Sequence, residues 1–473
     1  MRQRLYTSQN RKWWTLGAVA FGLFMIMLDN TVVNVALPSI QRDLGVTLSD
    51  LEWIVTGYAL SFAALMLTGG KLADLFGRRL IFVLGIAVFT FSSLMCGLAD
   101  SGNELIAWRI IQGIGAALMN PATLAIISAT FPPQQRGMAI GIWVGVSAMA
   151  LAIGPLVGGL LTEHIGWSWI FFVNVPVGVL GTVASFLLID ESRDDSHEQR
   201  PDIPGLLTSG LGLFSLTYGL IEANNYGWTS GRILGAFALA AVLLAAFVVL
   251  ELHQRLPMMD LTLFKNGTFA GANLAMLLVA LAMFGVFFFV SLYMQNILGF
   301  SAVQAGAAFL PMTLLITIVA PIAGKLSDRF GSRWLITAGL TLLSIQLFYY
   351  SGLGKDATFW DLLPALIVGG VGMSLAMTPT AAAVIRAVPT AKAGVGSATL
   401  NSMRQVGGAL GIALMGAIMG HVTGGRQTPE AFVEGFSTSL RVAGLIALAG
   451  AVVAVALVRH ERHDVPVTAP GPA

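Results

Sequence analysis

Three charged residues, Asp29, Arg109 and Arg404, lie inside long apolar stretches of the sequence. A carboxylate in partly dry surroundings favours its protonated form, whereas a neighbouring guanidinium favours its ionised form. A change in hydration, or the arrival of a competing cation, can therefore switch whether such a carboxylate holds a proton. We expect Asp29 and Arg109 to form a pair that binds and releases a proton. A fixed ion pair without proton exchange is the alternative.

The composition indicates what surrounds these charges. Of the 473 residues, 56% are hydrophobic and only 11% are charged, against roughly 25% charged residues in an ordinary soluble protein. Apolar stretches of about 20 residues, the length that an α-helix needs to cross a bilayer, recur from one end of the chain to the other. The sequence therefore predicts an all-α polytopic membrane protein, with the lipid bilayer as its surroundings.

Several other classes of protein are excluded by the same sequence. A net charge of +2 and scattered basic residues give no reason to expect nucleic-acid binding. The single cysteine, Cys96, cannot form an intrachain disulfide. The phosphate-binding pattern G-x-x-x-x-G-K-[ST] and the zinc pattern H-E-x-x-H do not occur in the sequence. We therefore expect neither an ATP-driven pump nor an enzyme, and no metal or other cofactor.

Charged clusters and Gly or Pro breaks divide the chain into fourteen expected spans. A charge-free stretch, 266–324, is too long for one span and is divided at Asn296, Gly299 and Ser301. The expected spans are 13–36, 53–69, 80–99, 105–128, 138–161, 168–189, 203–221, 233–250, 269–294, 304–324, 334–354, 362–385, 396–420 and 438–458.

The depths of Asp29 and Arg109 favour a contact between them. At a rise of about 1.5 Å per residue, Asp29 lies about 24 Å from the start of its span at Trp13, and Arg109 lies about 8 Å from the start of its span near Glu104. The two spans run in opposite directions across a core of roughly 30 Å. Both residues therefore lie at nearly the same depth, where a charge needs a partner.

Basic residues are distributed unevenly between alternate loops. Most of the 26 Lys and Arg residues fall on the side of the N-terminus, and only four fall on the opposite side. Those four are Arg42, Arg232, Lys355 and Arg426. Because basic residues in short loops mark the cytoplasmic side, we expect both termini in the cytoplasm, in a plasma membrane such as the bacterial inner membrane.

An internal repeat divides the chain. The loop after the second expected span reads GKLADLFGRR (Gly70 to Arg79), and the loop after the tenth reads GKLSDRFGSR (Gly324 to Arg333), with seven of ten positions identical. We therefore expect an N-terminal six-helix bundle in 1–190, a loop with two inserted helices in 191–265, and a C-terminal six-helix bundle with a short tail in 266–473. Such repeats are common in transporters.

Both copies of this loop carry residues suited to a tight turn between helices and to ion pairs. Glycine permits the turn, an acidic residue is favourable near a helix N-terminus, and arginines can pair with carboxylates. We expect these loops to act as gates that hold one conformation; topology-setting charge is the alternative. The expected gating residues are Gly70, Asp74, Gly77, Arg78, Arg79, Gly324, Asp328, Arg329, Gly331 and Arg333.

The fifth expected span contains GPLVGG, from Gly154 to Gly159. Gly154 and Gly158 share a helix face, so that another helix can approach closely, while Pro155 removes a helix hydrogen bond and permits a bend. We expect Gly154, Pro155, Gly158 and Gly159 to form a hinge that seals one side of the molecule; ordinary small-residue packing is the alternative.

Polar and aromatic side chains inside the spans are candidates for lining a cavity. Aromatic rings suit flat cationic ligands, although the same residues also fill ordinary helix interfaces. Glu52 and Glu222 lie at span ends, where we expect solvated charges. The candidate cavity residues are Asn30, Asn34, Gln112, Phe284, Phe288, Tyr293, Gln295, Arg404 and Gln405.

Four motifs resemble those of the major facilitator superfamily, and within it the fourteen-span drug:proton antiporters. LDNTVVNVALPSI (Leu28 to Ile40) resembles the first-helix motif of that branch, GKLADLFGRR the superfamily's loop signature, RIIQGIGAALMNPA (Arg109 to Ala122) the fourth-helix motif and GPLVGG the fifth-helix motif of antiporters. The resemblance covers nearly the whole chain. One departure is Leu75, where the signature usually carries Arg; the second copy keeps it as Arg329.

The resemblance implies the major facilitator fold, two six-helix bundles plus two inserted helices, in a protein that is monomeric. It also implies a proton-coupled antiporter that exports amphiphilic, often cationic, small molecules by alternating access, with protons as the coupled ions. The alternatives are an exporter of one endogenous metabolite or lipid, an uptake carrier, and a membrane sensor that transports nothing.

Overall fold

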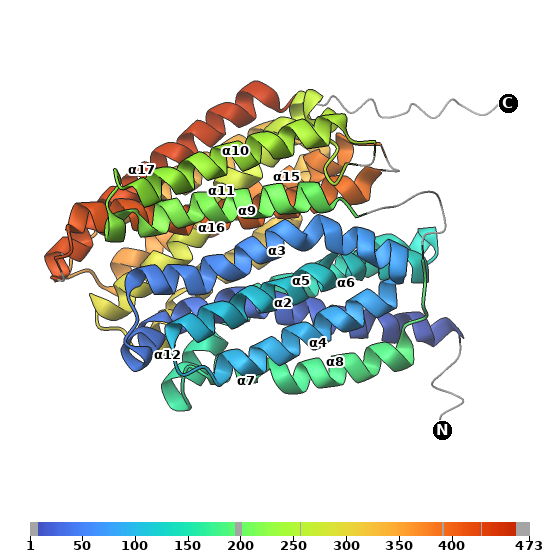
Figure 1. Ribbon diagram of the computed structural model, residues 1–473, viewed down its shortest axis with the longest axis horizontal. Coiled ribbons are helices and arrows are strands. Elements are labelled where there is room, and N and C mark those ends of the chain that lie inside the picture. Colours follow the sequence, from blue (N-terminus) through green and yellow to red (C-terminus); the bar gives the residue numbers. More distant parts are fainter. Residues whose placement is uncertain (1–7, 194–200, 256, 390–391, 427, 460–473) are drawn as a thin grey trace.

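The computed structural model describes residues 8–193, 201–255, 257–389, 392–426 and 428–459. Within them the chain forms helices and turns and no strand. The helices lie side by side along the long axis of the molecule (Figure 1). The basic N-terminal segment 1–7 and the tail 460–473, both of which contribute to the expected orientation, lie outside the described residues.

The helices of the N-terminal part are α2 (Ser8–Leu44), α3 (Leu48–Phe76), α4 (Arg78–Gly97), α5 (Gly102–Thr130), α6 (Pro133–His164), α7 (Trp169–Phe172) and α8 (Asn174–Leu188). The middle part forms α9 (Ile203–Tyr226), α10 (Gly231–His253) and the short 3-10 helix η1 (Leu261–Lys265). The C-terminal part forms α11 (Gly267–Asn296), α12 (Ala302–Ala308), α13 (Leu310–Phe330), α14 (Ser332–Tyr350), α15 (Phe359–Arg386), α16 (Ala393–Thr423) and α17 (Pro429–Leu457).

Each of the fourteen expected spans coincides with a helix or with a consecutive pair of helices. In the described part of the chain, thirteen segments are long and apolar enough to cross a membrane, with α7 and α8 forming one of them and α12 and α13 another. The fourteenth is α14, which has 19 residues and carries Ser, Thr, Gln and Tyr side chains that lower its hydropathy. The protein is therefore an all-helical, multi-span membrane protein.

The two halves of the chain pack as separate groups that meet along a few helices. In the first group α5 packs against α3 and α4, and in the second α14 packs against α15 and α17. The groups meet where α2 packs against α11, where α3 packs against α16, and where α6 packs against α12 and α13. Helix α9 packs against both α3 and α16, and α10 lies outside it against α9 (Figure 1).

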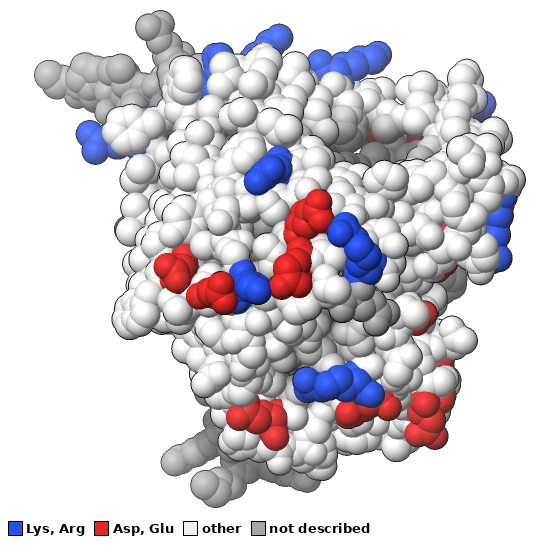
Figure 2. All heavy atoms as spheres, turned by 90° about the vertical axis from the view of Figure 1, so that its left-hand side faces the viewer, with Lys and Arg blue, Asp and Glu red and all other residues white. Residues whose placement is uncertain are grey.

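Two ends of the molecule are distinguished below. The outer end is the one where α2 ends at Leu44 and α3 begins at Leu48, and the inner end is the one where α2 begins at Ser8. These names follow the expected orientation. Figure 2 views the outer end, where the charged side chains form small groups on a mostly uncharged surface.

Candidate functional site

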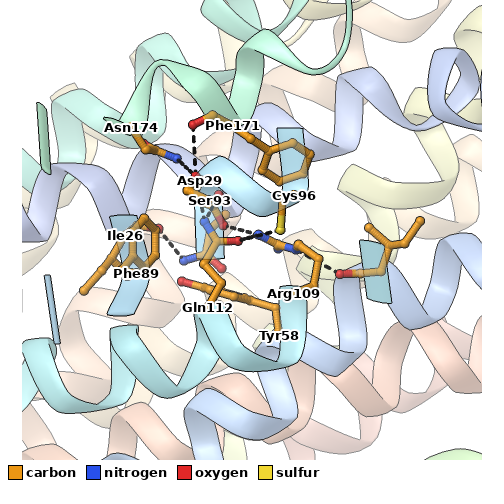
Figure 3. A network of polar contacts seen from close by, with 12 residues as sticks. Ile26, Asp29, Tyr58, Phe89, Ser93, Cys96, Arg109, Gln112, Phe171 and Asn174 are labelled. Carbon is orange, nitrogen blue, oxygen red and sulfur yellow. Dashed lines mark hydrogen bonds and ion pairs between the residues drawn. The ribbon is translucent and has the colours of Figure 1, made fainter. Parts of the chain in front are cut away.

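Asp29 of α2 and Arg109 of α5 form an ion pair in the interior of the N-terminal group of helices (Figure 3). The Nη1 atom of Arg109 lies 2.5 Å from Oδ2 of Asp29, and the side chains are 1% and 0% exposed. The depth argument from the sequence therefore correctly predicted their contact. Buried charges of this kind must be paired, because neither group can be hydrated where it lies.

Gln112, one turn along α5 from Arg109, joins the two charges to a wider polar network. Its Oε1 accepts from Nη1 of Arg109 at 2.7 Å, and its Nε2 donates to Oδ1 of Asp29 at 3.1 Å and to Oγ of Ser93 at 3.2 Å. Asn174 of α8 also donates to Ser93, at 3.1 Å. The sequence-based prediction placed Gln112 in a cavity wall; the side chain is fully buried in this network.

Arg109 has further partners on α3. Its Nε donates to the backbone carbonyl of Ile54 at 3.1 Å, and its guanidinium carbon lies 4.3 Å from the centre of the Tyr58 ring, a cation–π distance. Arg109 therefore keeps a carbonyl, an amide oxygen and an aromatic face as partners in addition to Asp29. These partners could hold the guanidinium in place when Asp29 is neutral.

Four residues around the ion pair were not singled out from the sequence: Ser93, Asn174, Ile54 and Tyr58. Ser93 and Asn174 are polar residues inside apolar helices, a signal that the sequence does carry, since a buried polar side chain needs a partner. The contribution of Ile54 is a backbone carbonyl, and no residue type signals such a contact.

Arg404 and Gln405 lie on α16, in the other half of the chain. Arg404 is partly buried and near enough to Tyr58 to interact with it electrostatically. Within the described residues Nε of Arg404 and Nε2 of Gln405 have no hydrogen-bond partner. Buried donors without partners are uncommon in proteins, and here two of them lie on the helix that packs against α3.

The remaining candidate cavity residues have different surroundings. Asn30 and Asn34 both donate back to their own helix, to the carbonyls of Ile26 at 2.8 Å and Asn30 at 3.1 Å. Oδ1 of Asn34 has no partner among the described residues. Gln295 of α11 donates to the carbonyl of Val35 in α2 at 2.9 Å, so this residue connects the two halves.

The aromatic candidates on α11 take part in helix packing. Phe288 is fully buried, with its ring centre 4.8 Å from that of Phe289. Phe284 is partly buried against Gly408. Tyr293 stacks on Phe436 of α17 at 4.7 Å, and its hydroxyl donates to the carbonyl of Gly354. In this structure these three rings lie against protein side chains and backbone.

The GPLVGG segment of α6 lies between α2 and α12. A Cβ added to Gly154 would stand 1.9 Å from Oγ1 of Thr31, and one added to Gly158 would stand 2.8 Å from the carbonyl oxygen of Val32. Such distances leave no room for any side chain, so both glycines allow α6 to approach α2 closely. The close packing expected from the motif is therefore present at this position.

The same segment contacts the other half at the outer end. A Cβ added to Gly306 of α12 would stand 2.1 Å from the carbonyl oxygen of Pro155. Nearby, Oε2 of Glu163 accepts from the backbone nitrogen of Val303 at 2.8 Å. The outer ends of the two halves are therefore joined directly through α6 and α12.

The segment Gly70–Arg79, most of which belongs to α3, makes its ion pairs within itself and with the loop that follows α8. Asp74 lies in the last turn of α3 and pairs with Arg78 at 2.9 Å. Gly77 has a φ of +120°, which favours glycine, and Gly70 lies against Pro121. Only Gly77 therefore separates the end of α3 from the start of α4.

The carboxylate at the N-terminus of α4 is that of Glu191, not that of Asp74 as the sequence suggested. Glu191 accepts from the backbone nitrogens of Arg79 at 3.0 Å and Leu80 at 3.2 Å. The prediction was wrong because Asp74 is still part of α3 and its side chain is used by Arg78. Glu191 comes from the loop after α8, which no local pattern could have placed there.

The second copy of the loop is arranged differently. Asp328 pairs with Arg386 at the end of α15, at 3.0 Å. Arg329 and Arg333 lie 5.2 Å from the ring centres of Phe330 and Trp334. Gly331 has a φ of +80° and lies at the turn, as expected. Gly324 lies instead inside α13, against Thr378 of α15. The ion pair of this copy therefore lies within the C-terminal part of the chain.

Glu52 does not have the solvated position expected from the sequence. Its exposed fraction is 2%, because α9 and α16 cover the first turns of α3. Glu222 of α9 is half-buried, and its carboxylate accepts from Nε1 of Trp53 at 3.2 Å and from Nδ2 of Asn225 at 2.9 Å.

Comparison with known proteins identifies the family. The family model described as Major Facilitator Superfamily matches residues 19–411 and 272–473. The chain is 37% identical over 411 residues, 87% of this chain and 76% of the relative, to the tetracenomycin C resistance and export protein of Streptomyces glaucescens. It is 36% identical over 470 residues, 96% of this chain and 93% of the relative, to the puromycin resistance protein pur8 of Streptomyces alboniger.

Solved structures show the same fold at low sequence identity. A bacterial homologue of the human lysosomal transporter Spinster matches with a TM-score of 0.68 and 18% identity, over 95% of this chain and 97% of that chain. A POT family transporter in complex with 5-aminolevulinic acid matches with a TM-score of 0.69 and 14% identity, over 93% of this chain and 94% of that chain. The chain is therefore a multi-span membrane transporter that belongs to the major facilitator superfamily.

Proposed function

We propose that this transporter is a proton-coupled antiporter that exports amphiphilic, often cationic, drugs from the cytoplasm by alternating access. The buried pair of Asp29 and Arg109 is the observation that carries the proposal. A carboxylate with 0% exposure beside a guanidinium has two competing influences on its proton, dehydration and the neighbouring positive charge. Relatives named for resistance to, or export of, tetracenomycin C and puromycin support drug export.

The polar network supplies a physical route for proton exchange. When Asp29 takes a proton, its attraction for Arg109 falls, and the guanidinium is held by Gln112 and by the carbonyl of Ile54. When Asp29 loses the proton, its carboxylate again accepts hydrogen bonds from Arg109 and from the amide of Gln112. Because α2, α3 and α5 all contribute to this exchange, a change in protonation alters how these helices hold one another. A cationic substrate would act by competing with the proton for Asp29.

The same proposal includes the arrangement of the molecule in the membrane. Residues 1–190 and 266–473 form the two six-helix bundles that move against one another, and 191–265 supplies the inserted pair of helices. Both termini lie in the cytoplasm of a bacterial cell, and the protein acts as a monomer. Contacts such as those of Gly159 with Ala302 and Glu163 with Val303 support closure of the outer side in this conformation.

Transport by the purified protein in proteoliposomes with an imposed pH gradient tests the proposal. Wild-type protein should move a lipophilic cation or a neutral drug against the proton, so that adding substrate releases protons from the acidic compartment. The variant Asp29→Asn should insert and fold but lose this coupling. Asp100→Asn, in an outer loop, is the matched control. Undiminished coupled export by Asp29→Asn would overturn the assignment, as would flux in the same direction as the proton.

A further inference from the structure

A cavity of about 1010 Å³ opens at the outer end of the molecule, away from the network around Asp29. It lies between the ends of α2, α3, α9, α11, α16 and α17, at the end of the molecule that faces the reader in Figure 2. Cavities that hold drug-sized molecules measure about 300–1,000 Å³. The size is therefore sufficient for an organic molecule, and much larger than a proton or a metal ion requires.

Among the residues that line this cavity, Glu52 is the carboxylate. The residue is 2% exposed and forms part of the cavity wall. Gly416 of α16 makes room for it, since a Cβ there would stand 1.8 Å from Oε1 of Glu52. A carboxylate largely removed from water is unfavourable unless a proton or another cation joins it.

The neighbouring charged residues include one further carboxylate and two basic side chains. Glu222 of α9 is not part of the cavity lining, and its carboxylate already has two neutral donors, Trp53 and Asn225. His421 of α16 also borders the cavity, as does Arg426. The guanidinium of Arg426 is engaged by Glu434 at 3.2 Å and by the carbonyl of Thr423 at 3.0 Å.

The walls of the cavity favour an organic cation over a bare one. Leu292, Met419, Phe432 and Trp228 contribute apolar and aromatic surface to the lining. Aromatic rings attract organic cations through the negative face of the ring. No group of three or more possible metal ligands is present within the described residues. One carboxylate in a wall of mixed apolar and polar residues suits a monovalent organic cation.

We propose that Glu52 holds the cationic group of a transported organic cation at an outer binding site, which the substrate occupies as it leaves the protein. The site rests on the proposed export function and is distinct from the Asp29 network. Its components are α3 from the first half, α9 from the inserted pair and α16 from the second half. Helix α9 would then contribute to substrate binding. Glu52 would favour cationic substrates over neutral ones.

Binding of tetraphenylphosphonium, a permanent monovalent cation, to purified protein tests the site by equilibrium dialysis. Glu52→Gln keeps the size of the side chain and should weaken binding at least tenfold. Glu222→Gln, whose carboxylate has its own donors, should change binding less than twofold. Gly416→Ala, which displaces the Glu52 carboxylate, should weaken binding in the same direction as Glu52→Gln. Equal binding by wild-type and Glu52→Gln protein would overturn the proposal.

Transport in proteoliposomes separates this site from a route for protons. Glu52→Gln should reduce pH-driven export of tetraphenylphosphonium at least tenfold while export of chloramphenicol, a neutral drug, stays within twofold of wild type. Loss of both activities would mean that Glu52 serves protons or folding, and would overturn the proposal. If wild-type protein exports neither compound, the proposed export function fails, and the dialysis result still decides whether Glu52 binds a cation.

Discussion

Gly159 of α6 packs directly on the backbone of Ala302 at the start of α12: a Cβ at Gly159 would stand 2.4 Å from the carbonyl oxygen of Ala302. Gly306 makes the reciprocal contact with the carbonyl of Pro155. Since a carbonyl oxygen in a helix cannot yield as a flexible side chain does, even one methyl group here must push the two helices apart. This contact makes the outer junction between the two halves sensitive to the smallest substitution.

We expect Gly159→Ala to open the outer junction. The methyl group should separate α6 from α12, slow pH-driven export several-fold, and admit reagents from the outer side. Asn34→Cys, whose position is buried in α2 beside α11, provides the reporter. A membrane-impermeant maleimide added outside should label this cysteine several times faster when Gly159→Ala is also present. The native Cys96 is fully buried and should contribute little label.

Gly141→Ala is the matched control for this experiment. Gly141 lies in the same helix, and a Cβ there would meet nothing within 4 Å. Labelling and export should therefore stay at the wild-type level in this variant. If Gly159→Ala also labels at the wild-type rate, the junction does not gate access from the outside.

The ion pair could be predicted from the sequence because helix rise fixes depth. Asp29 and Arg109 share a depth whatever the details of packing, and two charges at one depth have few other partners. The rotation of each helix about its own axis is not fixed in this way. That is why Gln112 was expected in a cavity wall and lies in the network, and why Phe288 lies against Phe289.

Residues whose environment is built by distant segments were predicted least well. Glu191 caps α4 from a loop more than 100 residues away in the sequence, and nothing near Arg78 signals its arrival. Glu52 is buried by α9 and α16, helices that lie far along the chain, so its position at a span end wrongly indicated a solvated charge. Spans, repeat and motifs are local patterns, whereas these contacts depend on how the two halves and the inserted pair pack.

Replacing Arg109 by lysine should uncouple transport although the charge is kept. Arg109 contacts Asp29, Gln112, the carbonyl of Ile54 and the ring of Tyr58 at once, and an ammonium group lacks the planar, forked geometry to keep all four. We expect substrate-dependent proton release from proteoliposomes to fall at least tenfold. Arg441→Lys, on the exposed face of α17, should behave as wild type. Normal coupling in Arg109→Lys would show that positive charge alone suffices.

Removing the carboxylate at the start of α4 should destabilise the fold. Glu191→Gln leaves the backbone nitrogens of Arg79 and Leu80 with a weaker acceptor, and lost helix caps cost about 0.5–2 kcal/mol. We expect a melting temperature lower by about 1–3 °C in detergent. Asp190→Asn is the adjacent control, because Asp190 pairs with Arg11 while 72% exposed, and exposed pairs contribute little. Equal melting of the two variants would contradict the cap.

The ion pair between Asp260, at the start of η1, and Lys392, at the start of α16, should stabilise the fold in a pH-dependent way. Nζ of Lys392 donates to Oδ2 of Asp260 at 2.6 Å, and this bond, with a second from Thr262, holds the pKa of Asp260 below its ordinary value. Because the folded-state pKa is lowered, the stabilisation is present above the unfolded pKa of about 3.9 and is lost as the pH falls through the folded value. The melting temperature of the wild type should therefore exceed that of Asp260→Asn by a constant margin from about pH 5 to 8. That margin should shrink below about pH 4. Lys392→Met should remove most of the margin at every pH, and a margin that grew on acidification would contradict the assignment.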